Sequence, residues 1–170
     1  MLNKKIEDAL NKQINAELYS SYLYLSMQAY FESENLGGFA NWMGVQMQEE
    51  LSHALKIFNF VNERNGRVWL KAIDQPQTEW KSPLDVFEET LKHEQKVTGM
   101  ISKLADLAIS EKDHATTSFL KWFVDEQVEE EASANKILQQ LIMIKGSTGG
   151  LFMLDKELGK RSFNSSAKED

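Results

Sequence analysis

Four long stretches of the sequence each place a glutamate within an apolar helical stripe. Glu50 and His53 are three residues apart, a spacing that puts both side chains on one face of a helix. Carboxylate oxygens combined with an imidazole suit a hard or borderline metal such as iron or manganese. An ionised carboxylate buried without a partner costs several kcal/mol, so converging glutamates need one another or a cation. The candidate metal ligands are Glu17, Glu50, His53, Glu94, Gln127 and Glu130.

Apolar residues recur at helical spacing around each candidate ligand. Glu17, for example, lies on a heptad-spaced line with Leu10 and Phe31. The other apolar residues of the four stripes are Ile14 and Leu18; Met43, Met47, Ala54, Ile57 and Val61; Phe87, Leu91, Val97 and Ile101; and Leu120, Phe123, Val124, Ala134 and Ile137. The polar positions fall near mid-helix, so an up-and-down bundle brings them to a similar height, within about two turns of 5.4 Å each. No lysine or arginine lies on these stripes, so we expect a metal to balance the carboxylates.

Three further features resemble parts of such a site. Tyr24 lies two turns beyond Glu17, where its phenol either serves a metal-bound carboxylate, by a hydrogen bond or an electron, or simply packs. A second Glu-x-x-His occurs at Glu111 and His114, but no apolar face surrounds it, so we expect a solvated turn. His93 lies beside the third stripe and is expected to be solvated as well.

The acidic run 126–131 would ordinarily form a solvated face. Only part of it can be solvated, because the run also contains candidate ligands of the core site. Glu126 and Glu129, together with Glu49 from the second stripe, would then form an acidic ledge just beyond the main site. Such a ledge either holds a third cation in transit or is an ordinary solvated surface. The residues alone leave these two interpretations open.

Long helices are expected to position these residues. The helical periods predict helices over residues 3–32, 37–65, 83–110 and 114–144. Ser82 can cap the third helix, with Pro83 in its first turn and Asp85 answering the cap. The first two helices, and the last two, are joined by a few residues and must pack antiparallel. The sequence therefore predicts an all-α fold made of two helical hairpins.

The connection between the hairpins is long enough to span the bundle. Residues 66–82 can reach roughly 55 Å when extended, whereas a thirty-residue helix is roughly 45 Å long. This length permits a four-helix bundle with one long crossover between helices two and three. A short fifth helix is expected over residues 149–160, completing a single domain of residues 1–161. The polar segment 162–170 is predicted to be a disordered tail.

Composition restricts the function further. The chain has 170 residues with 42% hydrophobic content, enough for one domain with a proper core. It contains no cysteine, which excludes disulfides, zinc fingers and cysteine-ligated iron–sulfur clusters. A net charge of −7 disfavours nucleic acid as a partner. The charged N-terminus and the lack of a membrane-length apolar stretch favour a cytoplasmic protein that does not use a membrane.

Several segments of the chain resemble the ferritin family, in particular the non-haem ferritins of bacteria and archaea. The resemblance extends from Leu2 to about Lys160 and rests on residues 15–24, 39–43, 48–54, 93–94 and 119–131. It implies a shell of 24 identical subunits that stores ferric oxyhydroxide, with the short fifth helix lining the four-fold axes. It also implies a ferroxidase that oxidises ferrous iron with dioxygen or hydrogen peroxide.

The same resemblance implies roles for individual residues. Glu17, Glu50 and His53 would hold the first iron of a di-iron centre. Glu50 would bridge to a second iron held by Glu94 and Glu130. The remaining matches are Gln127 near the second iron, Tyr24 as the tyrosine beside the carboxylates, and Glu49, Glu126, Glu129 and Glu130 as the third iron site of bacterial members.

Differences from bacterioferritins and rubrerythrins narrow the choice among related families. Haem-containing bacterioferritins carry a glutamate and a histidine where this chain has Gln127 and Glu130. They also carry a haem-ligating methionine where this chain has Leu51. We therefore expect iron but no haem. Rubrerythrins repeat the Glu-x-x-His motif on the fourth helix, which this chain does not. The alternatives are a di-iron or di-manganese peroxide-decomposing enzyme of small oligomeric size, and a metal-free helical interaction module.

Overall fold

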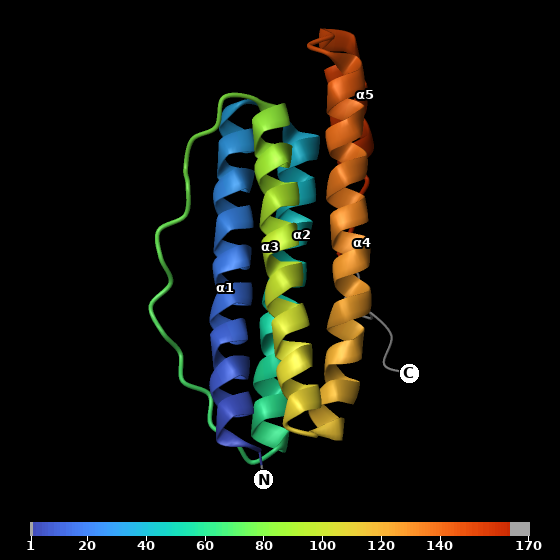
Figure 1. Cartoon of the computed structure of the whole chain (residues 1–170). Helices are drawn as coiled ribbons and strands as arrows, with labels where there is room; N and C mark the ends of the chain where they lie inside the picture. Colours follow the sequence, from blue (N-terminus) through green and yellow to red (C-terminus); the bar gives the residue numbers. More distant parts are fainter. Residues whose placement is uncertain (1, 164–170) are drawn as a thin grey trace.

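The structure is a computed structural model, and it describes residues 2–163. Within these residues, helices are the only regular secondary structure. They are α1 (Lys4–Ser33), α2 (Gly37–Glu63), α3 (Pro83–Ser110), α4 (His114–Ile144) and α5 (Thr148–Leu158). The first four pack as a bundle of nearly parallel rods (Figure 1). The predicted all-α four-helix bundle with a short fifth helix is confirmed. Most of the predicted disordered tail, residues 164–170, lies outside the described residues.

Local capping explains where the helices begin. The side chain of Asn3 accepts from Lys5 N at 2.9 Å, and that of Asp113 accepts from Thr116 N at 3.0 Å. Ser82 caps α3 as predicted, accepting from Asp85 N at 3.2 Å. These bonds satisfy backbone donors that a helix start leaves unpaired.

The long crossover runs beside α1 (Figure 1). Its backbone is tied to that helix at two heights. Near the start of α1, Asn11 Oδ1 accepts from Trp69 N at 2.6 Å. Farther along, Ser26 donates to the carbonyl of Gln77 at 2.6 Å. The predicted crossover between α2 and α3 is therefore confirmed, and α1 supports it along its length.

The apolar core consists of two clusters. One joins the end of α1, the starts of α2 and α3, the end of α4 and the short helix α5, and includes Met27, Phe31, Phe39, Met43 and Phe87. The other lies toward the opposite end and includes Ile6, Leu10, Ile57, Ile101 and Leu120. The predicted stripes supply most of these residues. Val124 is an exception: it is 42% exposed, because its neighbour Phe123 takes the inward position on α4.

The short helix α5 completes the start of α2. The N-cap residue of α2, Leu36, makes no side-chain capping bond. Instead, Asp155 Oδ1 of α5 accepts from Gly38 N at 2.8 Å and Phe39 N at 3.0 Å. A Cβ at position 38 would lie 1.6 Å from the Asp155 carbonyl oxygen, so only glycine allows this approach. Among residues 2–163, no helix combines the length and the apolarity needed to cross a membrane.

Candidate metal centre

Carboxylates from all four long helices converge between the two apolar clusters. Three sets of side chains each bring their oxygen or nitrogen atoms within 4.8 Å of one another. The sets are Glu17, Glu50 and His53; Glu50, Glu94 and Glu130; and His53, Glu126 and Glu130. The predicted ligands Glu17, Glu50, His53, Glu94, Gln127 and Glu130 are each no more than 5% exposed. The structure therefore assembles all of them in one buried layer.

Glu50 belongs to two of these sets, which gives the layer the geometry of two adjoining cation positions. It shares one set with Glu17 and His53, and another with Glu94 and Glu130. His53 Nδ1 lies 3.7 Å from Glu50 Oε2. A carboxylate shared in this way can give one oxygen to each of two metal ions. The bridging role of Glu50 stays a prediction.

Two buried glutamines orient the carboxylates. Gln13 Nε2 donates to Glu17 Oε1 at 2.8 Å. Gln46 Nε2 donates to Glu50 Oε1 at 3.1 Å and to Glu130 Oε2 at 2.7 Å. Neither glutamine was predicted from the sequence. Each precedes a predicted ligand by four residues, a helical spacing that places the two side chains on one face and would have identified them.

Glu94 is held by a phenol and an amide. Tyr24, which is fully buried, donates a short hydrogen bond to Glu94 Oε1. Gln127 Nε2 lies 3.3 Å from Glu94 Oε2 and 3.2 Å from Thr98 Oγ1. Of the two interpretations left open for Tyr24, contact with a site carboxylate is therefore the one that its geometry supports.

Burial makes this layer electrostatically costly without a cation. It raises the pKa of Glu17, Glu50 and Glu130 well above the usual range, and neighbouring carboxylates raise each pKa further. Burial also raises the pKa of Glu94. Glu17 Oε2 is buried and has no hydrogen-bond partner among the described residues. This oxygen is therefore available to coordinate a divalent metal ion, together with the other carboxylate oxygens and the imidazole.

Aromatic rings border the imidazole. His53 contacts Trp122 edge-on, with 5.3 Å between ring centroids, and Phe123 at 6.1 Å. Lys56 Nζ lies 4.5 Å from the centre of the Trp122 ring. Trp122 is half-buried, and its contact with His53 places its ring directly against the imidazole.

The predicted acidic ledge is divided. Glu126 is half-buried beside His53 and Glu130, and burial raises its pKa. Glu129 is exposed and belongs to none of the three sets. Glu49 belongs to none either, and it forms an ion pair with Arg161. Glu49 and Glu129 nevertheless lie close enough to raise the pKa of Glu126 further. The third metal position therefore stays a prediction.

His93 is not the solvated side chain that we expected. Its Nε2 lies 2.8 Å from Ser20 Oγ, and its ring packs edge-on against Tyr24 at 6.0 Å. Burial and nearby Lys96 lower its pKa to about 4, so the ring is neutral. The prediction failed because α1 covers this side of α3, which a stripe drawn on α3 alone cannot reveal.

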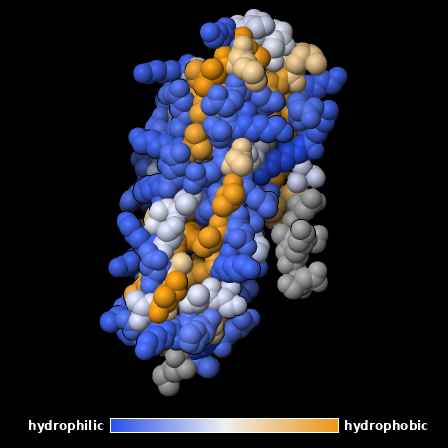
Figure 2. Space-filling model, turned by 45° about the vertical axis from the view of Figure 1, so that its right-hand side comes forward, coloured by the Kyte–Doolittle hydropathy of each residue, from blue (hydrophilic) through white to orange (hydrophobic). Residues whose placement is uncertain are grey.

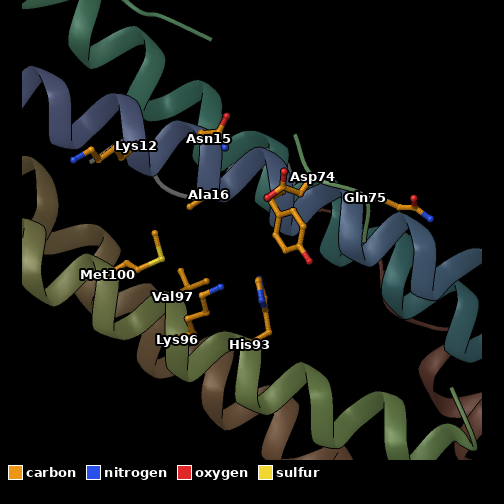
Figure 3. A pocket seen from close by; sticks show the side chains of 10 residues that line it. Lys12, Asn15, Ala16, Asp74, Gln75, His93, Lys96, Val97 and Met100 are labelled. Carbon is orange, nitrogen blue, oxygen red and sulfur yellow. The ribbon is translucent and has the colours of Figure 1, made fainter. Parts of the chain in front are cut away.

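A cavity of about 490 Å³ lies on the other side of His93. Figure 3 shows His93, Lys96 and Met100 on α3 directed toward α1, whose residues Lys12 and Ala16 also line the cavity.

The second Glu-x-x-His motif lies outside the site. Glu111 is bound at 2.7 Å by both Asn3 Nδ2 and Lys5 Nζ, and His114 is exposed at the start of α4. Glu111 therefore helps to anchor the beginning of α1, a structural role that the expectation of a solvated turn missed.

Comparison with known proteins places nearly the whole chain in one family. The family described as a ferritin-like domain matches residues 7–144. A protein described as bacterial non-heme ferritin from Bacteroides fragilis strain 638R is 44% identical over 161 residues, covering 95% of this chain and 100% of the relative. A Staphylococcus saprophyticus protein of the same description is 43% identical over 166 residues, covering 98% and 99%.

Solved structures agree with these matches. A closed form of the Archaeoglobus fulgidus ferritin, engineered by site-directed mutagenesis, superimposes with a TM-score of 0.95 at 54% identity, covering 96% of this chain and 100% of that one. A crystal structure of the open-pore ferritin of the same archaeon gives a TM-score of 0.94 at 55% identity, covering 95% and 98%.

Proposed function

Because this chain belongs to the ferritin family, we propose that it stores iron by oxidising two ferrous ions in the buried carboxylate layer. The observation that carries this proposal is the pair of ligand sets that share Glu50. One position would be formed by Glu17, Glu50 and His53, and the other by Glu50, Glu94 and Glu130. Iron is the substrate of this reaction, and no haem takes part.

The residues of the layer suit the reaction. Each Fe²⁺ gives up one electron. Dioxygen accepts the two electrons with two protons to form hydrogen peroxide. If hydrogen peroxide is the oxidant, it accepts two electrons with two protons to form two water molecules. Anionic ligands favour the more highly charged ferric state. Burial raises the pKa of the carboxyl groups, so binding of Fe²⁺ displaces their remaining protons. Tyr24 and the glutamines keep the carboxylates in position during this exchange.

Oxidised iron then needs an enclosed space, and we propose a homo-oligomeric shell, with 24 subunits as in the resemblance above. Apolar side chains on the surface support this part of the proposal. Figure 2 shows a narrow hydrophobic stripe along an otherwise hydrophilic face. The most exposed large apolar side chains are Leu70, Val128, Met143, Phe152 and Met153, each at least 67% exposed. Such residues are commonly covered in an assembly.

The proposal is tested by adding ferrous iron to the metal-free protein under air and following ferric absorbance. We expect rapid oxidation and a large, iron-filled assembly. Glu50→Ala should slow oxidation by more than about 100-fold, the upper end of the cost of losing an outer partner at a metal site. Glu111→Ala, in the second copy of the motif, is the matched control and should oxidise iron at the parent rate. A small oligomer with no accelerated oxidation would contradict the proposal.

A further inference from the structure

Arg161 reaches the edge of the carboxylate layer from beyond α5. It follows the end of α5 by three residues, and Asn41 of α2 fixes this segment by donating to the carbonyls of Leu158 at 3.2 Å and Arg161 at 2.9 Å. The guanidinium lies over the Trp42 ring, with its carbon 4.4 Å from the ring centre. Both the backbone and the side chain of Arg161 are therefore held in place against α2.

One nitrogen of this guanidinium contacts two side chains at the edge of the carboxylate layer. Arg161 Nη2 donates to Gln46 Oε1 at 3.0 Å and forms a short ion pair with Glu49 Oε2. The Arg161 and Glu49 side chains are 22% and 26% exposed, so water screens this pair less than a surface pair. Gln46 itself is fully buried.

The contact with Gln46 decides which way its amide faces. A glutamine amide has one accepting oxygen and one donating nitrogen, whereas a guanidinium only donates. Because Gln46 must turn its oxygen to Arg161, its nitrogen faces the site, donating to Glu50 and Glu130 at 3.1 and 2.7 Å. The opposite orientation would direct an oxygen at two carboxylates and a nitrogen at a cation.

The contact with Glu49 concerns the third metal position. Glu49 was predicted to contribute to that position with Glu126, Glu129 and Glu130. Its carboxylate is instead neutralised by Arg161, while Glu126 and Glu130 remain beside His53. A third cation that uses Glu49 competes with the guanidinium for the charge of this carboxylate.

We propose that Arg161 is a positioning residue of the iron site with two linked effects. It holds the Gln46 amide toward Glu50 and Glu130, and it competes with a third cation for Glu49. This inference rests on the proposed function, since it concerns the occupancy of the same metal centre.

The test measures zinc binding, because Zn²⁺ is a redox-inert probe of divalent sites. Metal-free, full-length protein is titrated with Zn²⁺ by calorimetry, and the bound zinc per subunit is counted after dialysis. The parent should bind two zinc ions tightly and a third weakly. Arg161→Ala should bind the third about 10-fold more tightly, since loss of a charge-assisted contact frees Glu49. Arg161→Lys keeps the charge and should leave this affinity within about threefold of the parent.

Lys160 provides the matched control. It is the neighbouring cation, and its ammonium pairs with Glu157 and not with the site. Lys160→Ala should therefore leave all zinc affinities unchanged. Unchanged third-site affinity in Arg161→Ala would overturn the inference. If the alanine variant does not assemble, Arg161→Gln provides the same measurement.

A double-mutant cycle tests whether Arg161 acts on the two main sites through Gln46. Arg161→Ala should weaken the two main zinc sites by about 3- to 10-fold in the parent background and have no further effect in a Gln46→Leu background. Equal effects in both backgrounds would show that Arg161 does not act through Gln46. A parent protein that neither binds zinc nor oxidises iron would instead refute the proposed function, so the two failures are distinguishable.

Discussion

Neutral donors hold the buried carboxylates in place. Gln13 donates to Glu17, Gln46 to Glu50, and Tyr24 to Glu94. A hydrogen bond from a neutral donor orients a carboxylate but does not cancel its charge. The carboxylates therefore keep their need for cations, and Glu17 Oε2 lacks even a hydrogen bond from the described residues. Each glutamate consequently favours metal binding but lowers the stability of the metal-free protein.

This conflict predicts a pH dependence of the metal-free protein. Burial raises the pKa of Glu17, so the folded state binds more protons than the unfolded state between the ordinary carboxyl pKa and the raised value. The free energy of unfolding therefore falls as the pH rises through that window. Glu17→Gln, which is neutral at every pH, should make the decline shallower and add about 1–3 kcal/mol near its upper end. Denaturant unfolding between about pH 5 and 8 measures both effects.

The control for this prediction is Glu88→Gln, which neutralises an exposed glutamate on α3. It should leave the pH dependence unchanged. Saturating Zn²⁺ should reverse the trend in the parent protein, because metal binding displaces the protons that stabilise the metal-free state. A decline that is equally steep in Glu17→Gln would show that burial of this carboxylate does not cause it.

Helix α2 depends on a residue more than a hundred positions away. Asp155 of α5 accepts from the amides of Gly38 and Phe39, where Leu36 makes no cap of its own. Asp155→Ala should lower the free energy of unfolding by about 1–2 kcal/mol, the usual cost of losing an N-cap. It should also speed amide hydrogen exchange at Gly38 and Phe39. Asp155→Asn keeps an accepting oxygen and should remain close to the parent; equal loss in both variants would contradict a capping role.

Helical periodicity made the buried glutamates predictable, because a polar residue on an apolar stripe can be recognised within one helix. Glu17, Glu50 and Glu94 were each identifiable as a polar residue on an apolar stripe, and the structure buries all three. Gln46 was also within reach, since it precedes Glu50 by four residues. The same reasoning could not find Arg161, because no helical period relates a residue beyond α5 to α2. The absence of cations from the stripes did not exclude one arriving from the chain end.

At the scale of the molecule, connection lengths decided the topology. Residues 66–82 were long enough to span a rod, and the structure runs this segment beside α1, tied at Asn11 and Ser26. Contacts between helices were less accessible to prediction. His93 was expected in solvent because its own helix gives no reason to bury it, yet Ser20 and Tyr24 of α1 cover it.

The exposed apolar face of α5 is the remaining large-scale feature, and it predicts how the assembly can be weakened. Leu154 and Leu158 pack into the core, whereas Phe152 and Met153 are 68% and 67% exposed. If these side chains are covered by other subunits, Phe152→Asp places an unpaired charge in an apolar contact, and light scattering should show smaller oligomers. Lys156→Asp, on an exposed polar position of the same helix, should leave the assembly size unchanged. A full-sized shell from Phe152→Asp would show that α5 contributes no essential contact, and assembly would then depend on the apolar side chains of the long helices and the crossover.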